Sequence, residues 1–211
     1  MYIQITTRCN MICGHCCFSC TRFGRDMVRD TFLEALALAE GRGENIALGG
    51  GEPTIHPLFW EYLGLSLGSG SEEIWMATNG KETKTALALA KIAERGAVAV
   101  ALSVDPWHEE ISPAVIKAFS LGPNGYGHRR ENDLRDMRVI KDTRQVIKAG
   151  RCDWGKEGCR CPELFVKTSG KIYGCGCKTA PYFGTVSDPK VPEGWQAGEC
   201  HKEQRHLEVP F

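Results

Sequence analysis

Three cysteines near the start of the chain have the spacing of a metal-cluster loop. Cys9, Cys13 and Cys16 are separated by three and two residues, so one loop can place three thiolates around a single cubane iron–sulfur cluster. Because a [4Fe–4S] cubane has one iron more than this loop has thiolates, one iron keeps no protein ligand. In catalytic metal sites the open position is where a substrate or cofactor binds. Other residues of the chain are then expected to bind the ligand that occupies the open iron.

The eleven cysteines of this 211-residue chain fall into two groups. The first group is Cys9, Cys13, Cys16, Cys17 and Cys20, and the second is Cys152, Cys159, Cys161, Cys175, Cys177 and Cys200. The N-terminus lacks the basic and apolar regions of a secretory signal, which predicts a cytoplasmic protein. In that compartment clustered cysteines bind metal more often than they form disulfides. We expect Cys17 and Cys20, which are additional to the spacing, to be small buried residues, with a substrate-side or metal-binding pair as the alternative.

Composition indicates a globular protein without a strong overall charge. Hydrophobic residues make up 42%, charged residues 25%, and the net charge is zero, so no overall field favours nucleic acid or a membrane surface. No apolar run approaches the ~20 residues that span a bilayer. Residues 129–151 carry eight Lys or Arg against four acidic residues. We interpret this segment as a solvated face, with an anionic substrate as the alternative.

Strands and helices are expected to alternate along the first half of the chain. Strands are predicted at 2–6, 45–49, 73–78 and 98–104, and helices at 30–40, 57–67, 82–95 and 113–119. This alternation implies right-handed βαβ units and a parallel sheet. One or two further short strands are expected within 137–147. A full eight-stranded barrel usually needs ~250 residues, so we predict an α/β fold with a partial, open (β/α) barrel of five or six parallel strands.

Polar or glycine-rich sequences follow four successive predicted strands. They are the cysteine loop, Gly49-Gly50-Gly51-Glu52-Pro53, Thr78-Asn79-Gly80 and Ser103-Val104-Asp105. Ligands of parallel α/β sheets bind at the carboxyl ends of the strands. The four sequences should therefore converge on one face. The three glycines in succession would allow a ligand to approach the backbone closely.

The cysteine loop after a first strand, followed by Gly49–Pro53 after the second, resembles the radical S-adenosylmethionine (SAM) superfamily over about residues 1–110. The resemblance implies that SAM binds the open iron and is cleaved by an electron from the cluster. The resulting 5′-deoxyadenosyl radical would abstract a substrate hydrogen atom. Oxygen sensitivity and an electron donor such as flavodoxin or ferredoxin are also implied.

The same resemblance assigns SAM contacts to individual positions. Gly49, Gly50, Gly51 and Glu52 would bind the methionine amino group, Thr78, Asn79, Ser103 and Asp105 the carboxylate and ribose, and His15 the adenine. A loop histidine bonded to backbone is the alternative for His15. His108 and His128 could reach the same face, but no role is assigned to them.

The second cysteine group surrounds an expected hairpin over 163–173 that turns at Ser169-Gly170. This arrangement is similar to the SPASM and twitch extensions of radical SAM enzymes, which implies one auxiliary [4Fe–4S] cluster. The expected ligands are Cys152, Cys161 and Cys175 with Cys159, Cys177 or Cys200. A structural zinc held by four cysteines is the alternative. We predict a barrel domain over 1–150 and a cysteine-rich extension over 151–211.

The leading functional hypothesis is a radical SAM enzyme that modifies a peptide or a small molecule. No peptide-binding winged domain is expected before the barrel, which disfavours a leader-guided peptide enzyme. Modification of a nucleoside or nucleic-acid base is a second hypothesis, supported by the basic 129–151 segment. A non-catalytic iron–sulfur or zinc protein is a third, and the absence of a ferredoxin-type spacing argues against it.

Overall fold

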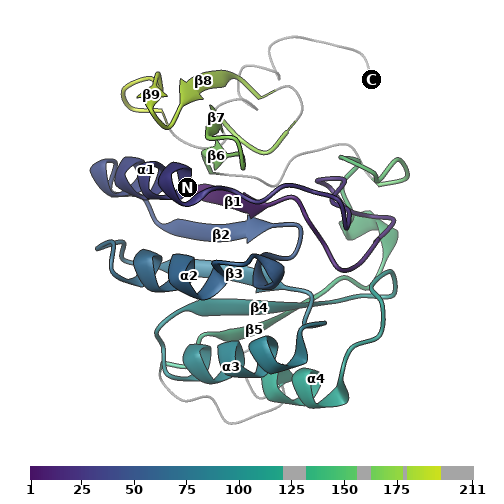
Figure 1. Ribbon diagram of the computed structural model, residues 1–211. Helices are drawn as coiled ribbons and strands as arrows, with labels where there is room; N and C mark the ends of the chain where they lie inside the picture. Colours follow the sequence, from purple (N-terminus) through teal and green to yellow (C-terminus); the bar gives the residue numbers. More distant parts are fainter. Residues whose placement is uncertain (121–131, 156–162, 178–179, 196–211) are drawn as a thin grey trace.

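The computed structural model describes residues 1–120, 132–155, 163–177 and 180–195, and these form a nine-stranded sheet (Figure 1). The strands are β1 Tyr2–Thr6, β2 Ile46–Gly50, β3 Ile74–Thr78, β4 Ala99–Val104, β5 Arg135–Val139, β6 Phe165–Val166, β7 Lys171–Tyr173, β8 Tyr182–Thr185 and β9 Asp188–Pro189. The α-helices are α1 Arg29–Gly41, α2 Phe59–Leu67, α3 Thr83–Glu94 and α4 Pro113–Ser120. Two 3₁₀ turns, η1 Pro53–Ile55 and η2 Thr143–Gln145, complete the described elements.

The strand order is β5-β4-β3-β2-β1-β6-β7-β8-β9, and the pairs from β5 to β6 in this order are all parallel. The predicted open, mostly parallel α/β sheet is therefore confirmed. The expected elements within 137–147 are one strand, β5, and the turn η2. None of the helices in the described ranges combines the length and apolar character that crossing a membrane requires.

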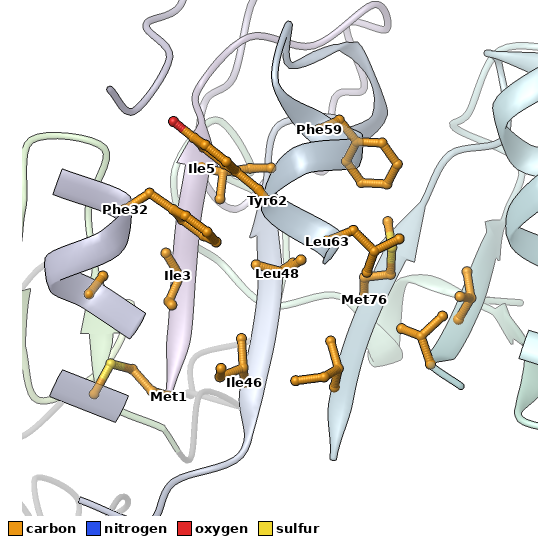
Figure 2. Close-up of a cluster of buried hydrophobic side chains, with 14 of the residues drawn as sticks. Met1, Ile3, Ile5, Phe32, Ile46, Leu48, Phe59, Tyr62, Leu63 and Met76 are labelled. Carbon is orange, nitrogen blue, oxygen red and sulfur yellow. The ribbon is translucent and has the colours of Figure 1, made fainter. Parts of the chain in front are cut away.

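Apolar side chains of the first three strands pack under α1 and α2 (Figure 2). Ile3, Leu48 and Met76 are fully buried. Phe32 of α1 and Tyr62 of α2 stack with ring centroids 3.9 Å apart, and the Tyr62 hydroxyl donates to the carbonyl of Met27 at 2.9 Å. Burial of each such side chain contributes about 1.5–3 kcal/mol. This core holds β1, β2 and β3 in register, so the loops that follow them start from fixed positions.

The predicted hairpin in the tail is confirmed, and its position was not foreseen. β6 and β7 pair antiparallel, and Gly170 takes the positive φ of +77° that the turn requires. β6 also pairs parallel with β1, on the edge of β1 opposite to β2. The ring of Tyr2 stacks on Phe165 with centroids 5.0 Å apart. The tail hairpin thus continues the barrel sheet next to the strand that leads into the cysteine loop (Figure 1).

Candidate functional site

The loops after β1, β2 and β3 are joined to one another by hydrogen bonds, as the parallel sheet predicts. The Glu52 amide donates to the carbonyl of Arg8 at 2.9 Å, which joins the glycine-rich loop to the cysteine loop. The Asn79 amide donates to the Glu52 carboxylate at 2.7 Å, which joins the loop after β3 to both. The predicted convergence of these loops at one end of the sheet is therefore confirmed.

The thiols of Cys9, Cys13 and Cys16 are close enough to affect one another. Burial, and next the neighbouring Cys9 and Cys16, raise the pKa of Cys13 to about 12. Burial likewise raises the pKa of Cys9. A group of thiols that oppose each other's ionisation is suited to a metal centre, whose positive charge stabilises the thiolates.

Backbone amides in the cysteine loop point at two of the sulfurs. The amide of Met11 lies 3.4 Å from Cys9 Sγ, and the amide of Cys20 lies 3.4 Å from Cys16 Sγ. Hydrogen bonds of this kind to cluster sulfurs are one of the means by which proteins tune iron–sulfur potentials. The donor set and its surroundings therefore fit a cluster held by three thiolates.

The two additional cysteines of the loop differ from each other. Cys20 is buried as predicted, and hydrogen bonding to its thiol lowers the pKa of Cys16 to about 5. The prediction of burial is wrong for Cys17, which is exposed. Cys20 is thus a neighbour of a candidate ligand rather than only a packing residue.

Glu52 is almost completely buried and connects the ends of β2 and β3. Its Oε1 accepts from the hydroxyls of Thr78 at 2.8 Å and Thr54 at 2.6 Å, and its Oε2 accepts from the Asn79 amide. Burial raises the pKa of Glu52 despite these bonds. The structure therefore brings together Glu52, Thr78 and Asn79, three of the predicted SAM contacts, in one hydrogen-bonded network.

The glycine run has a packing role that the sequence did not reveal. A Cβ on Gly49 would lie 2.0 Å from the Tyr2 hydroxyl, and one on Gly50 would lie 2.1 Å from the carbonyl oxygen of Thr6. The Gly50 amide donates to the Tyr2 hydroxyl at 2.8 Å. A larger residue at position 50 would therefore collide with the backbone of β1, and one at position 49 would displace the Tyr2 ring, whether or not a ligand is bound. The predicted contact of Gly49, Gly50 and Gly51 with SAM stays a prediction.

Asn79 extends from β3 to the first cysteine. Its Nδ2 donates to Asn10 Oδ1 at 2.9 Å and lies 3.8 Å from Cys9 Sγ. Lys81 Nζ donates to the carbonyl of Asn10 at 3.0 Å and pairs with Glu109. Sequence reasoning missed Asn10 and Lys81, and only their positions next to Cys9 and Asn79 could have indicated them. Through Asn10, the side chains of Asn79 and Lys81 hold the start of the cysteine loop against the end of β3.

Asp105 lies between two histidines just beyond the end of β4. Its Oδ2 is 3.2 Å from His15 Nε2 and 2.6 Å from His108 Nδ1, while its Oδ1 accepts from the amides of Trp107 and His108. Burial opposes ionisation, but the hydrogen bonds from His108 and His15 prevail and hold the pKa of Asp105 well below its usual range. Predicted residues His15 and Asp105 are thus brought together, and His108 gains a role that its sequence position, three residues after Asp105, could have suggested.

Aromatic rings lie beside the cluster of Asp105, His15 and His108. The His15 ring lies 5.4 Å from Trp107, and Trp107 lies 5.1 Å from Trp154. Ser103 is farther back, within β4 and opposite Arg138 of β5. The carboxylate and imidazoles can exchange hydrogen bonds with a hydroxylated ligand, and the rings offer flat surfaces to a base. The predicted roles of His15, Ser103 and Asp105 in binding SAM remain predictions.

The described cysteines of the tail are Cys152 and Cys175, both buried, and Cys177, which is half-buried. Cys159, Cys161, Cys200 and His128 lie outside the described residues. The predicted ligand set for an auxiliary cluster accordingly stays a prediction.

Comparisons with known proteins agree with this site. The model of the Radical SAM superfamily matches residues 3–149. The structure of BtrN in complex with AdoMet and 2-DOIA is similar, with a TM-score of 0.62, 11% identity, and coverage of 98% of this chain and 85% of that one. Streptococcus suis SuiB bound to precursor peptide SuiA gives a TM-score of 0.52 and 12% identity, covering 97% of this chain and 66% of that one. The search of curated proteins finds no match.

Proposed function

Because the chain belongs to the radical SAM superfamily, we propose that it is an enzyme that cleaves SAM reductively and removes a hydrogen atom from a peptide or a small molecule. The observation that carries the proposal is the convergence of the cysteine loop with Glu52, Asn79 and Asp105. In the described structure these side chains come from the ends of β2, β3 and β4 and are linked through Asn79 to Cys9 and through Asp105 to His15.

A [4Fe–4S] cluster with bound SAM would supply the chemistry, namely one-electron cleavage of a carbon–sulfur bond coupled to removal of a hydrogen atom from the substrate. Cys9, Cys13 and Cys16 would hold the cluster. The network of Glu52 and Asn79 would orient the methionine end of SAM, and Asp105 with its two histidines would bind the hydroxylated end. The rings of His15 and Trp107 would shield the site from water.

The substrate class rests on two structural neighbours. The BtrN structure contains AdoMet and 2-DOIA, and the SuiB structure contains a precursor peptide. At 11% and 12% identity these likenesses establish the fold alone, so the substrate class is our proposal, and it does not choose between a peptide and a small molecule. We propose flavodoxin or ferredoxin as the electron donor.

Two arginines of the basic segment at 129–151 bind acceptors within the protein, which weakens the support of this segment for a nucleic-acid substrate. Arg135 is 7% exposed and binds Asp133 through Nε and Nη2, so the prediction of a solvated residue is wrong at this position. Arg151 donates to carbonyl oxygens of the cysteine loop. Both guanidinium groups therefore donate to acceptors within the protein, namely the Asp133 carboxylate and the loop carbonyls. Two of the eight cations are thus used within the protein.

The proposal is tested by assaying SAM cleavage. After anaerobic reconstitution with iron and sulfide, addition of SAM and dithionite should yield 5′-deoxyadenosine, measured by chromatography. Protein without added dithionite is the control, because the cleavage needs an electron. An intact cluster that gives no 5′-deoxyadenosine would contradict an enzyme and favour an electron-transfer or scaffold protein.

We further propose that the tail holds one auxiliary [4Fe–4S] cluster. Buried Cys152 and Cys175 and the hairpin between them support this, with zinc as the alternative. In a variant with Cys9, Cys13 and Cys16 all changed to alanine, about four irons per chain should remain after reconstitution. Adding Cys152→Ala and Cys175→Ala to this variant should remove them. Zinc in place of residual iron would refute the auxiliary cluster.

A further inference from the structure

Arg151 contacts the cysteine loop through both its backbone and its side chain. Its amide donates to the carbonyl of Cys16 at 2.9 Å. Its Nη1 donates to the carbonyl of Cys13 at 3.0 Å and its Nη2 to the carbonyl of Cys20 at 2.5 Å. One residue, far along the chain, thus binds three carbonyl groups between the second candidate ligand and the end of the loop.

The residue before Arg151 makes this close approach possible. Gly150 has a φ of +60°, and a Cβ at this position would lie 2.3 Å from the carbonyl oxygen of Cys17. Only glycine fits both the backbone conformation and the distance. The residue after it, Cys152, is buried and is a candidate auxiliary ligand. The segment 150–152 therefore connects the two groups of cysteines.

We propose that Arg151 is a positioning residue for the SAM-binding cluster, which holds the loop from Cys13 to Cys20 in its cluster-binding shape and places a fixed positive charge beside the cluster. The inference rests on the proposed function in one respect, namely that Cys9, Cys13 and Cys16 bind an iron–sulfur cluster.

Two physical properties of arginine support this role. The guanidinium group is a rigid fork with several donors, so it can bind two carbonyl oxygens at once, which the single ammonium of lysine does less well. Its positive charge also favours reduction of the cluster. Transfer of one electron adds one negative charge to the cluster, and a neighbouring cation stabilises this reduced form more than the oxidised form. Arg151 should therefore both order the loop and raise the reduction potential of the cluster.

Substitution separates the two effects. Arg151→Gln removes the fork and the charge, whereas Arg151→Lys keeps the charge and loses the fork. Arg29→Gln is a matched control, because Arg29 is an exposed arginine of α1 that pairs with Glu61 of α2, away from the cysteine loop. The measurements are an anaerobic redox titration with dithionite, followed by electron paramagnetic resonance, and hydrogen–deuterium exchange of the loop from Cys13 to Cys20.

With Arg151→Gln, the ratio of reduced to oxidised cluster at a fixed potential should fall about tenfold, which for one electron corresponds to about 59 mV. Exchange in the loop should be faster. Arg151→Lys should show the faster exchange but a nearly normal potential, and Arg29→Gln should match the wild type in both. If Arg151→Gln does not retain iron, exchange of the iron-free proteins is compared instead.

Wild-type potential in Arg151→Gln would overturn the electrostatic role, and wild-type exchange in both Arg151 variants would overturn the positioning role. Neither readout depends on SAM cleavage. If the wild type binds a cluster but forms no 5′-deoxyadenosine, the proposed function fails, while the result for Arg151 still stands or falls on its own.

Discussion

Replacing Cys13 by alanine is expected to abolish the formation of 5′-deoxyadenosine and to remove the iron of the SAM-binding cluster. Cys13 is the middle ligand of the loop, and its thiol lies near those of Cys9 and Cys16. With only two thiolates the loop would leave two irons without protein ligands, and the cluster would be lost. Iron content after reconstitution and chromatography of the SAM products measure the two effects.

Cys17→Ala is the matched control, since Cys17 is a cysteine of the same loop whose side chain is exposed. It should retain the iron content and SAM cleavage of the wild type. If Cys13→Ala still cleaved SAM, or if Cys17→Ala lost its iron as completely as Cys13→Ala, the assignment of Cys9, Cys13 and Cys16 as the ligands would be wrong.

Replacing Glu52 by alanine should destabilise the protein and reduce SAM cleavage together. The carboxylate is buried and accepts hydrogen bonds from Thr54, Thr78 and Asn79. Its removal leaves the buried donors of Thr78 and Asn79 without their acceptor, at about 1–3 kcal/mol for each unsatisfied group. Asn79, which contacts Asn10 and Cys9, would lose the bond that positions its backbone. Thermal unfolding measures the stability, and the apparent SAM affinity measures the effect on the site.

Glu52→Gln is expected to fall between the wild type and Glu52→Ala, because the amide keeps one acceptor oxygen but turns the other into a donor. Glu61→Gln changes an exposed carboxylate of α2 and is the control. Each 1.36 kcal/mol lost in binding the transition state corresponds to about a tenfold lower rate. Wild-type melting and SAM cleavage in Glu52→Ala would show that the network does not position Asn79.

Sequence patterns were enough to predict the strands and helices, because these elements depend on interactions between residues that are close together in the chain. Alternating β-forming residues predicted β1 and β4, and apolar residues at helical spacing predicted α3. The convergence of the strand ends followed from parallel topology alone. Exposure at single positions was less predictable, as Cys17 and Arg135 show. Arg135 is buried because it donates to the carboxylate of Asp133 and to the carbonyl of Ala118 in α4, and the charge pattern of the segment reveals neither contact.

By itself the sequence determined the spacing of Cys9, Cys13 and Cys16, the glycine run at the end of β2 and the alternation of strands with helices, and these were enough to indicate the family. Only the tertiary structure decided which residues support the loop. Arg151 reaches it from more than 130 residues away in the chain, as the separation from Cys20 shows, and Asn79 reaches Cys9 across 70. Hydrogen bonds across such separations carry no periodic signal in the sequence, because each depends on how the fold brings two distant segments together.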